Sequence, residues 1–168
     1  MFAKRNMLTT KTVQELATLL GDKLSHAGLV AATAESCTGG GVAYAITEIS
    51  GSSQWFDRSF VTYSNNAKTQ MLGVDAKVID EFGAVSIPVV EAMALGAVKH
   101  SDADIAVAIS GIAGPDGGTI EKPVGTVCIA WYSHDQGLVS ETYTLAGDRA
   151  EVRYQATRMA LLGLIKHS

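Results

Sequence analysis

Apolar residues recur at different spacings along the chain, and these spacings predict its elements. Residues 12–27 open with a capping-box sequence and carry apolar side chains three and four apart, which predicts a helix that Gly28 ends. Residues 29–34 form an apolar run without polar alternation, which is typical of a strand buried on both faces. Glycine-rich sequence follows at once, so the next helix starts close behind this strand.

The rest of the chain continues to alternate between the two patterns. We predict further strands at 60–63, 105–109, 124–131 and 138–145, and further helices at 42–49, 66–72, 88–99 and from 148 onward. Strands that alternate with helices predict an α/β fold with a layered sheet. The last two strands favour a hairpin, so the sheet should be mixed. No linker or repeat interrupts residues 1–168, and we expect a single domain.

Composition and charge narrow the classes of protein. The chain has 168 residues, 47% hydrophobic and 18% charged, which excludes a disordered protein and allows a real core. Its net charge of −4 argues against direct nucleic-acid binding, which favours a basic surface. An anionic small-molecule ligand would therefore need a local positive site.

The cysteine and histidine content and the expected lack of targeting signals predict a cytoplasmic protein. Two cysteines do not make a disulfide framework, and the four histidines are scattered without metal-ligand spacing. We therefore expect no metal and no cofactor. The first six residues do not resemble a signal peptide, and no apolar stretch is long enough to cross a membrane. The sequence leaves the oligomeric state open, with a homo-oligomer as one option.

Three predicted strands end in loops with unusual residues. These loops are Ala-Glu-Ser-Cys-Thr-Gly-Gly-Gly at 34–41, Tyr-Ser-Asn-Asn-Ala-Lys at 63–68, and the glycine-rich stretch at 110–118. In open α/β sheets, ligands bind beyond the carboxyl ends of the parallel strands. If these strands are parallel, the three loops converge on one cleft. The third loop would then close the cleft or cradle a ligand, unless it is only a flexible surface loop.

The first loop places Ser36 on a tight strand-to-helix turn. Its glycines let a ligand approach the backbone, and the amides that open the next helix suit an oxyanion or a phosphate. Ser36 or Thr38 could instead merely cap that helix, as serine and threonine often do. The glycine triplet matches neither the dinucleotide fingerprint nor the P-loop. Cys37 is a rival nucleophile, which we interpret as structural because neighbouring side chains in a turn point apart.

Lys68 and Tyr63 complete a candidate catalytic set. Lys68 falls in the first turn of its predicted helix, where the dipole disfavours a cation and should lower its pKa. A neutral amine can act as a general base, and Tyr63 lies close enough in sequence to relay a proton. Separately, each residue could be a solvated lysine or a packing tyrosine. Together with Ser36 they form a Ser–Tyr–Lys set for nucleophilic catalysis.

A family resemblance rests on several of these stretches in order. The motifs at 34–40, 51–53, 61–65, 83–86, 110–118 and 122–126 resemble the CinA C-terminal domain family, over nearly the whole chain. Within that family the chain is most similar to stand-alone bacterial nicotinamide-nucleotide amidohydrolases, which convert nicotinamide mononucleotide to nicotinate mononucleotide and ammonia in pyridine nucleotide recycling. The resemblance implies a three-layer α/β/α sandwich with a mixed, mostly parallel sheet.

The resemblance also implies roles for particular residues. Matching motifs place a serine nucleophile, a tyrosine and a lysine at Ser36, Tyr63 and Lys68, and imply substrate-binding roles for Ser53, Ser110 and Arg149. Including the turn and the third loop, the expected substrate-binding positions are Thr38, Gly39, Gly40, Ser53, Ser110, Gly111 and Arg149. We expect the amides at 38–40 to stabilise the oxyanion and Arg149 to bind the substrate phosphate.

Two other functions stay open at this point. One is a non-catalytic nucleotide-binding or regulatory module of the competence/damage-inducible type, which would use the same loops. Lys68 argues against it, because a pure binding site needs no base beside a hydroxyl. The other is an interaction partner in DNA uptake or repair, which the acidic balance disfavours.

Overall fold

The computed structural model describes residues 10–168, so the expectation about a signal peptide lies outside the described residues. The helices are α2 (Val13–Ala27), α3 (Gly41–Thr47), α4 (Asn65–Leu72), α5 (Ala76–Phe82), α6 (Ile87–Lys99) and α7 (Arg149–His167), with a short 3₁₀ helix η1 (Ser52–Gln54). The strands are β1 (Ala31–Glu35), β2 (Phe56–Val61), β3 (Ile105–Gly111), β4 (Thr126–Ser133) and β5 (Gly137–Thr144).

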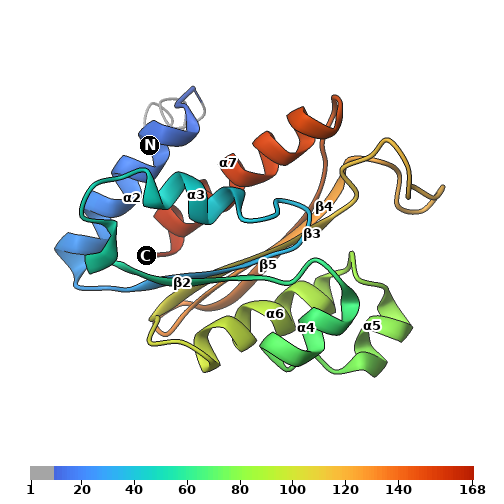
Figure 1. The fold of residues 1–168 in the computed structure, drawn as a ribbon, viewed down its shortest axis with the longest axis horizontal. Coiled ribbons are helices and arrows are strands. Elements are labelled where there is room, and N and C mark those ends of the chain that lie inside the picture. Colours follow the sequence, from blue (N-terminus) through green and yellow to red (C-terminus); the bar gives the residue numbers. More distant parts are fainter. Residues whose placement is uncertain (1–9) are drawn as a thin grey trace.

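The strands form one sheet in the order β2-β1-β3-β4-β5. Strand β1 pairs in parallel with both β2 and β3, whereas β4 runs antiparallel between β3 and β5. Figure 1 shows α2, α3 and α7 on one face of the sheet and α4, α5 and α6 on the other. The predicted three-layer α/β/α sandwich, its mixed sheet and the late hairpin are therefore confirmed.

The two faces of the sheet carry side chains of different size. The face toward α2, α3 and α7 is bulky, with residues such as Ile105, Val107 and Trp131 in its core. The face toward α6 carries small residues, namely Ala34, Ala106, Ala108 and Ala130. Small side chains let α6 lie close against the strands.

Helix α4 in turn rests directly on α6. A Cβ atom at Gly96 of α6 would overlap the backbone carbonyl of Leu72, so only glycine allows this approach. Leu72 is the last residue of α4, the helix that carries Lys68. The position of Lys68 therefore depends on how closely α6 packs against the sheet.

The structure differs from the prediction in the starts of two strands and in one additional helix. Strand β2 begins at Phe56 and ends at Val61, because its pairing with β1 starts there rather than at residue 60. Helix α5 was not predicted; it is short and begins at Ala76, after the N-cap residue Asp75, whose side chain accepts a hydrogen bond from the amide of Lys77. Strand β4 begins two residues later than predicted, because Gly125 turns the chain with φ +92°.

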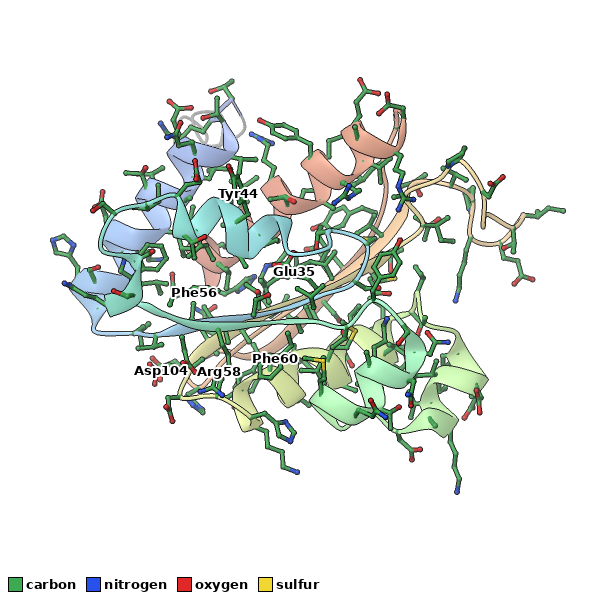
Figure 2. All side chains as sticks on the ribbon, viewed as in Figure 1. Glu35, Tyr44, Phe56, Arg58, Phe60 and Asp104 are labelled. Carbon is green, nitrogen blue, oxygen red and sulfur yellow. The ribbon has the colours of Figure 1, made fainter. Side chains whose placement is uncertain are left out.

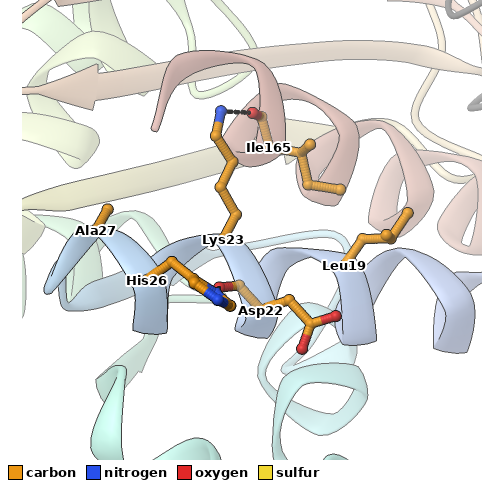
Figure 3. A pocket seen from close by; sticks show the side chains of 6 residues that line it. All are labelled: Leu19, Asp22, Lys23, His26, Ala27 and Ile165. Carbon is orange, nitrogen blue, oxygen red and sulfur yellow. Dashed lines mark hydrogen bonds between the residues drawn. The ribbon is translucent and has the colours of Figure 1, made fainter.

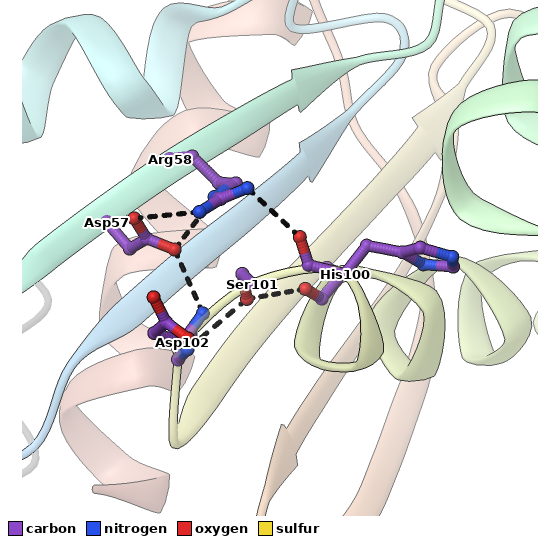
Figure 4. A network of polar contacts seen from close by, with 7 residues as sticks. Asp57, Arg58, His100, Ser101 and Asp102 are labelled. Carbon is purple, nitrogen blue, oxygen red and sulfur yellow. Dashed lines mark hydrogen bonds and ion pairs between the residues drawn. The ribbon is translucent and has the colours of Figure 1, made fainter.

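A polar network fastens the edge strand β2 to the turn that precedes β3 (Figure 4). The Asp57 carboxylate accepts hydrogen bonds from Arg58 Nε at 2.8 Å and from the amide of Asp102 at 3.0 Å. These bonds hold the pKa of Asp57 below its ordinary value, the Asp102 amide being the larger cause. The network lies where β2 and β3 begin, at the end of the sheet opposite to the predicted cleft, so we interpret it as structural.

Gly163→Ala is expected to lower the melting temperature. A Cβ atom at Gly163 would overlap the indole ring of Trp131, which a hydrogen bond from Nε1 to the Ala160 carbonyl fixes at 3.0 Å. Overpacking of this kind costs about 1–3 kcal/mol, and each kcal/mol lowers Tm by roughly 2–4 °C in a domain of this size. Circular dichroism would measure the change. Tyr154→Ala, on the exposed side of the same helix, is the control, and an unchanged Tm for Gly163→Ala would contradict this packing.

Candidate active site

A cavity of about 210 Å³ lies where β1, β2 and β3 end, and all three predicted loops contribute to it. This confirms that the loops converge on one site. Its walls combine a hydroxyl, an amine, a guanidinium and a thiol with small residues of the third loop. The lining residues are Ser36, Cys37, Tyr63, Asn65, Lys68, Ala84, Val85, Ser110, Gly111, Ala113 and Arg149.

A buried carboxylate organises the turn that carries Ser36. Glu35, the last residue of β1, is fully buried beneath the start of α3 (Figure 2). Its carboxylate accepts hydrogen bonds from the amides of Gly40, Val42 and Ala43, at 3.0, 3.1 and 2.9 Å, and from the Thr38 hydroxyl at 2.7 Å. A negative charge at the start of a helix is stabilised by free amides and by the helix dipole. The anion position of α3 is therefore occupied by the chain itself.

This arrangement corrects one expectation about the turn and rules out one alternative. The amides of Gly39 and Gly40 are not free for an oxyanion, because the first donates to the Ser36 carbonyl and the second to Glu35. Neither Ser36 nor Thr38 caps α3, whose N-cap residue is Gly40. Within residues 10–168, neither the Cys37 amide nor the Thr38 amide donates to another residue, although the Cys37 amide interacts with its own thiol. These two donors are therefore the ones that a ligand could use. The sequence pattern missed this because Glu35 resembles an ordinary strand residue.

Ser36 and Lys68 lie in contact inside the cavity. The Lys68 Nζ atom is 3.1 Å from the Ser36 Oγ atom and 2.8 Å from the Thr62 carbonyl oxygen, to which it donates. Lys68 is 1% exposed, and burial holds its pKa below the ordinary lysine value, although nearby Cys37 opposes the shift. The predicted direction of the pKa is thus confirmed, with desolvation rather than the helix start as the main cause.

Cys37 is unsuited to act as the nucleophile. Its side chain is buried, and burial raises the pKa of the thiol to about 11. A thiol with this pKa stays protonated near neutral pH, and only the thiolate is strongly nucleophilic. The chemistry of the cavity therefore favours Ser36.

Tyr63 and Arg149 pair at the mouth of the cavity. The Tyr63 side chain is 62% exposed, and its hydroxyl accepts a hydrogen bond from Arg149 Nη2 at 3.0 Å. Arg149 Nη1 donates to the Gly114 carbonyl of the third loop at 2.7 Å. Within the described residues, the Tyr63 hydroxyl is hydrogen-bonded to Arg149 rather than to Ser36 or Lys68.

The other predicted binding residues divide between the cavity and the rest of the surface. Ser110 is buried in the cavity wall, and its hydroxyl has no hydrogen-bond partner among residues 10–168. Gly111 also lines the cavity, where a Cβ atom would press on Val127 and Cys37.

Two other predicted binding residues lie outside the cavity. Thr38 faces a separate hollow between α2, α3 and α7. Ser53 is exposed on η1, before β2 begins, so in this chain it lies away from the cavity. The sequence motif could not show at which end of the strand it lies.

A second hollow, of about 540 Å³, lies beside the cavity and shares Ala113 and Arg149 with it. Arg153 also lines this hollow, and sequence analysis did not select it. Its Nε atom donates to the Cys37 carbonyl at 3.1 Å, and Nη2 donates to the Thr38 carbonyl at 3.2 Å. The available signal was its spacing, because residues four apart lie on the same side of a helix.

A larger hollow between α2 and α7 has no comparable chemistry (Figure 3). Its lysine, Lys23, donates to the Ile165 carbonyl, and the ring of His26 pairs with the Asp22 carbonyl. Neither a serine nor a cysteine lines it, so we do not consider it a catalytic site.

The described residues were also compared with what a metal site and a membrane-spanning helix require. Among residues 10–168, no group of three or more His, Cys, Asp or Glu side chains is placed to hold a metal ion. Likewise, none of the helices in this described part has the length and apolar character needed to cross a membrane.

Comparisons with known proteins agree on one family. The family model described as the CinA C-terminal domain matches residues 13–167. The chain is 52% identical to the nicotinamide-nucleotide amidohydrolase PncC of Escherichia coli K12 over 154 residues, covering 92% of this chain and 93% of that protein. It is 51% identical to the PncC of Pseudomonas putida, covering 92% and 96%.

Solved structures share the fold closely. The competence/damage inducible protein CihA from Agrobacterium tumefaciens superposes with a TM-score of 0.90 at 45% identity, covering 92% of this chain and 94% of that one. A competence or damage-inducible protein from Enterobacter asburiae gives a TM-score of 0.89 at 37% identity, covering 94% and 99%.

Proposed function

The chain belongs to the CinA C-terminal domain family, and from this and the geometry of the cavity we propose that it hydrolyses nicotinamide mononucleotide to nicotinate mononucleotide and ammonia. Relatives about half identical to it over almost their whole length bear the name nicotinamide-nucleotide amidohydrolase. The observation that carries the mechanism is the 3.1 Å contact between Ser36 Oγ and Lys68 Nζ. We place the reaction in the cytoplasm, in the recycling of pyridine nucleotides.

Ser36 is the nucleophile and Lys68 its general base. Burial favours the neutral amine of Lys68, which can accept the Ser36 proton directly as the oxygen attacks the carboxamide carbon. The resulting ammonium keeps its bond to the Thr62 carbonyl and gives a proton to the amide nitrogen, which leaves as ammonia when the C–N bond breaks. Water, activated by the same amine, then hydrolyses the acyl-enzyme. Because the serine and the lysine are in direct contact, no relay through Tyr63 is required.

The amides of Cys37 and Thr38 are the proposed oxyanion donors. They directly follow the nucleophile and, in residues 10–168, donate to no other residue. Donors that are already oriented toward the developing charge stabilise the transition state most. The buried hydroxyl of Ser110 is placed to hydrogen-bond the carboxamide of the bound substrate.

The two neighbouring hollows suit the two halves of the substrate. We place the nicotinamide ring in the cavity of about 210 Å³ and the ribose phosphate in the adjoining hollow of about 540 Å³. Arg149 lines both, so its guanidinium would lie beside the phosphate, with Tyr63 holding its orientation. The Asp148 carboxylate does not oppose this placement strongly, because it caps α7 by accepting a hydrogen bond from the Glu151 amide.

Arg149→Ala is expected to raise KM for nicotinamide mononucleotide about 10–100-fold, since hydrogen bonds to charged groups contribute about 1.5–3 kcal/mol. The nicotinamide riboside, which lacks the phosphate, is the matched control and should show little change. Steady-state ammonia release measures both. Equal losses on the two substrates would show that Arg149 serves the fold or the chemistry, and would move the phosphate site to the glycine-rich loop at 111–118.

A second candidate is a non-catalytic nucleotide-binding or regulatory module. It is favoured by one observation: a relative that is 50% identical is named a putative competence-damage inducible protein. Incubating the pure protein with nicotinamide mononucleotide, with and without a chelator, separates the two functions. We expect ammonia in both samples, whereas binding of the mononucleotide without ammonia would support the regulatory module.

A further inference from the structure

Arg153 links the hollow beside Arg149 to the turn at residues 36–40 that carries Ser36, here called the nucleophile turn. One edge of its guanidinium, formed by Nε and Nη2, holds the carbonyls of Cys37 and Thr38. The remaining nitrogen, Nη1, makes no hydrogen bond among residues 10–168. The side chain also lines the hollow that contains Arg149. A single side chain therefore reaches both the proposed phosphate position and the backbone behind Ser36.

The bond to the Cys37 carbonyl has a consequence for the proposed oxyanion donors. The carbonyl of Cys37 and the amide of Thr38 belong to the same planar trans peptide group, in which the C=O and N–H bonds point in opposite directions. Holding the carbonyl oxygen on the α7 side therefore fixes the direction of the Thr38 N–H. A carbonyl that accepts a charge-assisted hydrogen bond also polarises its peptide, which strengthens the N–H as a donor.

Glu35 and Arg153 hold opposite groups of the same turn. Glu35 accepts from the amides of residues 40, 42 and 43 and from the Thr38 hydroxyl. Arg153 donates to the carbonyls of residues 37 and 38. The Glu35 side chain is fully buried, whereas Arg153 is exposed at the edge of a hollow. The Arg153 side chain is therefore the one of the two that a ligand can reach.

We propose that Arg153 is a positioning residue that orients the Thr38 amide toward the oxyanion, and that an anion in the Arg149 hollow strengthens this orientation by binding Nη1. The inference rests on the proposed function, because it takes the substrate phosphate as that anion. It assigns the two arginines different tasks. Arg149 contributes to substrate affinity, whereas Arg153 contributes to the rate of the chemical step. Through Arg153, a bound phosphate also steadies the Thr38 amide of the nucleophile turn.

The first test separates kcat from KM. Losing one oxyanion donor costs about 10²–10³ in kcat, and a misdirected donor should cost at least about tenfold. Arg153→Ala should therefore lower kcat on both the mononucleotide and the riboside, with the KM for the riboside unchanged. Arg153→Lys should recover only part of the rate, because one ammonium cannot hold two carbonyls and an anion in one plane. Unchanged kcat in Arg153→Ala would overturn the proposal.

Arg158→Ala is the matched control variant. Arg158 lies on the same helix and donates to the Lys11 carbonyl at 2.9 Å, away from the cavity. Its removal should leave kcat on both substrates within about twofold, a difference below 1 kcal/mol. An equal loss of kcat in Arg158→Ala and Arg153→Ala would show a general effect of α7 on the fold and overturn the specific role.

The second test adds inorganic phosphate to the riboside reaction. Phosphate should raise the riboside kcat severalfold in the unmodified protein, because it restores the anion beside Nη1. It should have no such effect in Arg153→Ala. Absence of activation in the unmodified protein, or equal activation in the variant, would overturn the coupling.

A readout that needs no amidase activity keeps this inference distinct from the proposed function. Phenylmethylsulfonyl fluoride modifies a reactive serine, and mass spectrometry can locate the product at Ser36. We expect modification of Ser36 to be at least severalfold slower in Arg153→Ala than in Arg158→Ala. Failure of the protein to release ammonia would reject the proposed function alone, whereas equal labelling rates in the two variants would reject the role of Arg153.

Discussion

Ser36→Ala is expected to release no measurable ammonia from nicotinamide mononucleotide while keeping the melting temperature of the unmodified protein. The variant removes the only atom that can form the acyl-enzyme in the proposed mechanism, and loss of a nucleophile of this kind costs on the order of 10⁴–10⁶ in kcat. The fold should not suffer, because Ser36 Oγ does not cap α3 and, among residues 10–168, is hydrogen-bonded to Lys68 alone. Ammonia release and thermal unfolding, measured on the same preparation, check both expectations.

Cys37→Ser is the matched control for this prediction. It changes the neighbouring residue of the same turn, and the thiol that it removes has a pKa of about 11. Because a protonated thiol takes no part in the mechanism, this variant should retain kcat within about tenfold, with any loss due to a polar hydroxyl in a buried place. An active Ser36→Ala together with an inactive Cys37→Ser would transfer the nucleophile to the thiol.

Lys68→Met should lower kcat by about 10²–10⁴, the usual contribution of a general base. In the unmodified protein, kcat/KM should rise with pH as Lys68 loses its proton, since only the neutral amine can accept the proton of Ser36. This rising limb should be absent in Lys68→Met, whose side chain does not titrate. A pH–rate profile of the two proteins measures both effects.

The same variant should be at least as stable as the unmodified protein near neutral pH. Burial lowers the folded-state pKa of Lys68, so the unfolded chain binds its proton more tightly. The lysine therefore reduces the free energy of unfolding at pH values below its unfolded pKa, and this penalty shrinks as the pH rises toward that value. The melting temperatures of the two proteins should converge in alkaline solution.

Lys68→Arg distinguishes a base from a simple positive charge. A guanidinium keeps its charge at every accessible pH and cannot accept the serine proton. We expect almost no activity, together with a lower Tm, because a larger permanent cation would replace a buried amine. Full activity of Lys68→Arg would mean that Lys68 acts only electrostatically, and the proposed mechanism would be wrong.

The sequence predicted those parts of the site that depend on local patterns. The ends of β1, β2 and β3 were recognisable because each apolar run stops at an abrupt change of residue type. Parallel pairing then brings Ser36, Lys68 and Ser110 to the same edge of the sheet. The family resemblance added their expected roles.

The parts that were missed depend on contacts between residues far apart in sequence, or on how deeply a residue is buried. Arg153 reaches the Cys37 carbonyl from 116 positions away, and no periodicity of α7 indicates that contact. Glu35 is next to the nucleophile, yet its effect comes from burial, which the sequence of one short strand does not reveal. The misplaced start of β2 has a similar cause, because its pairing with β1, and not its composition, determines where the strand begins.

The layer of small side chains beneath the sheet makes catalysis sensitive to distant mutations. Lys68 reaches Ser36 from a helix that rests on α6 at Gly96, and α6 in turn packs on the sheet over small residues such as Ala106 and Ala108. We expect a methyl group added at one of these contacts to move the amine away from the serine. Natural substitutions that abolish the reaction should therefore occur among these small buried residues as well as around the substrate. A survey of natural variation that judged each position by its distance from the bound nucleotide would overlook them.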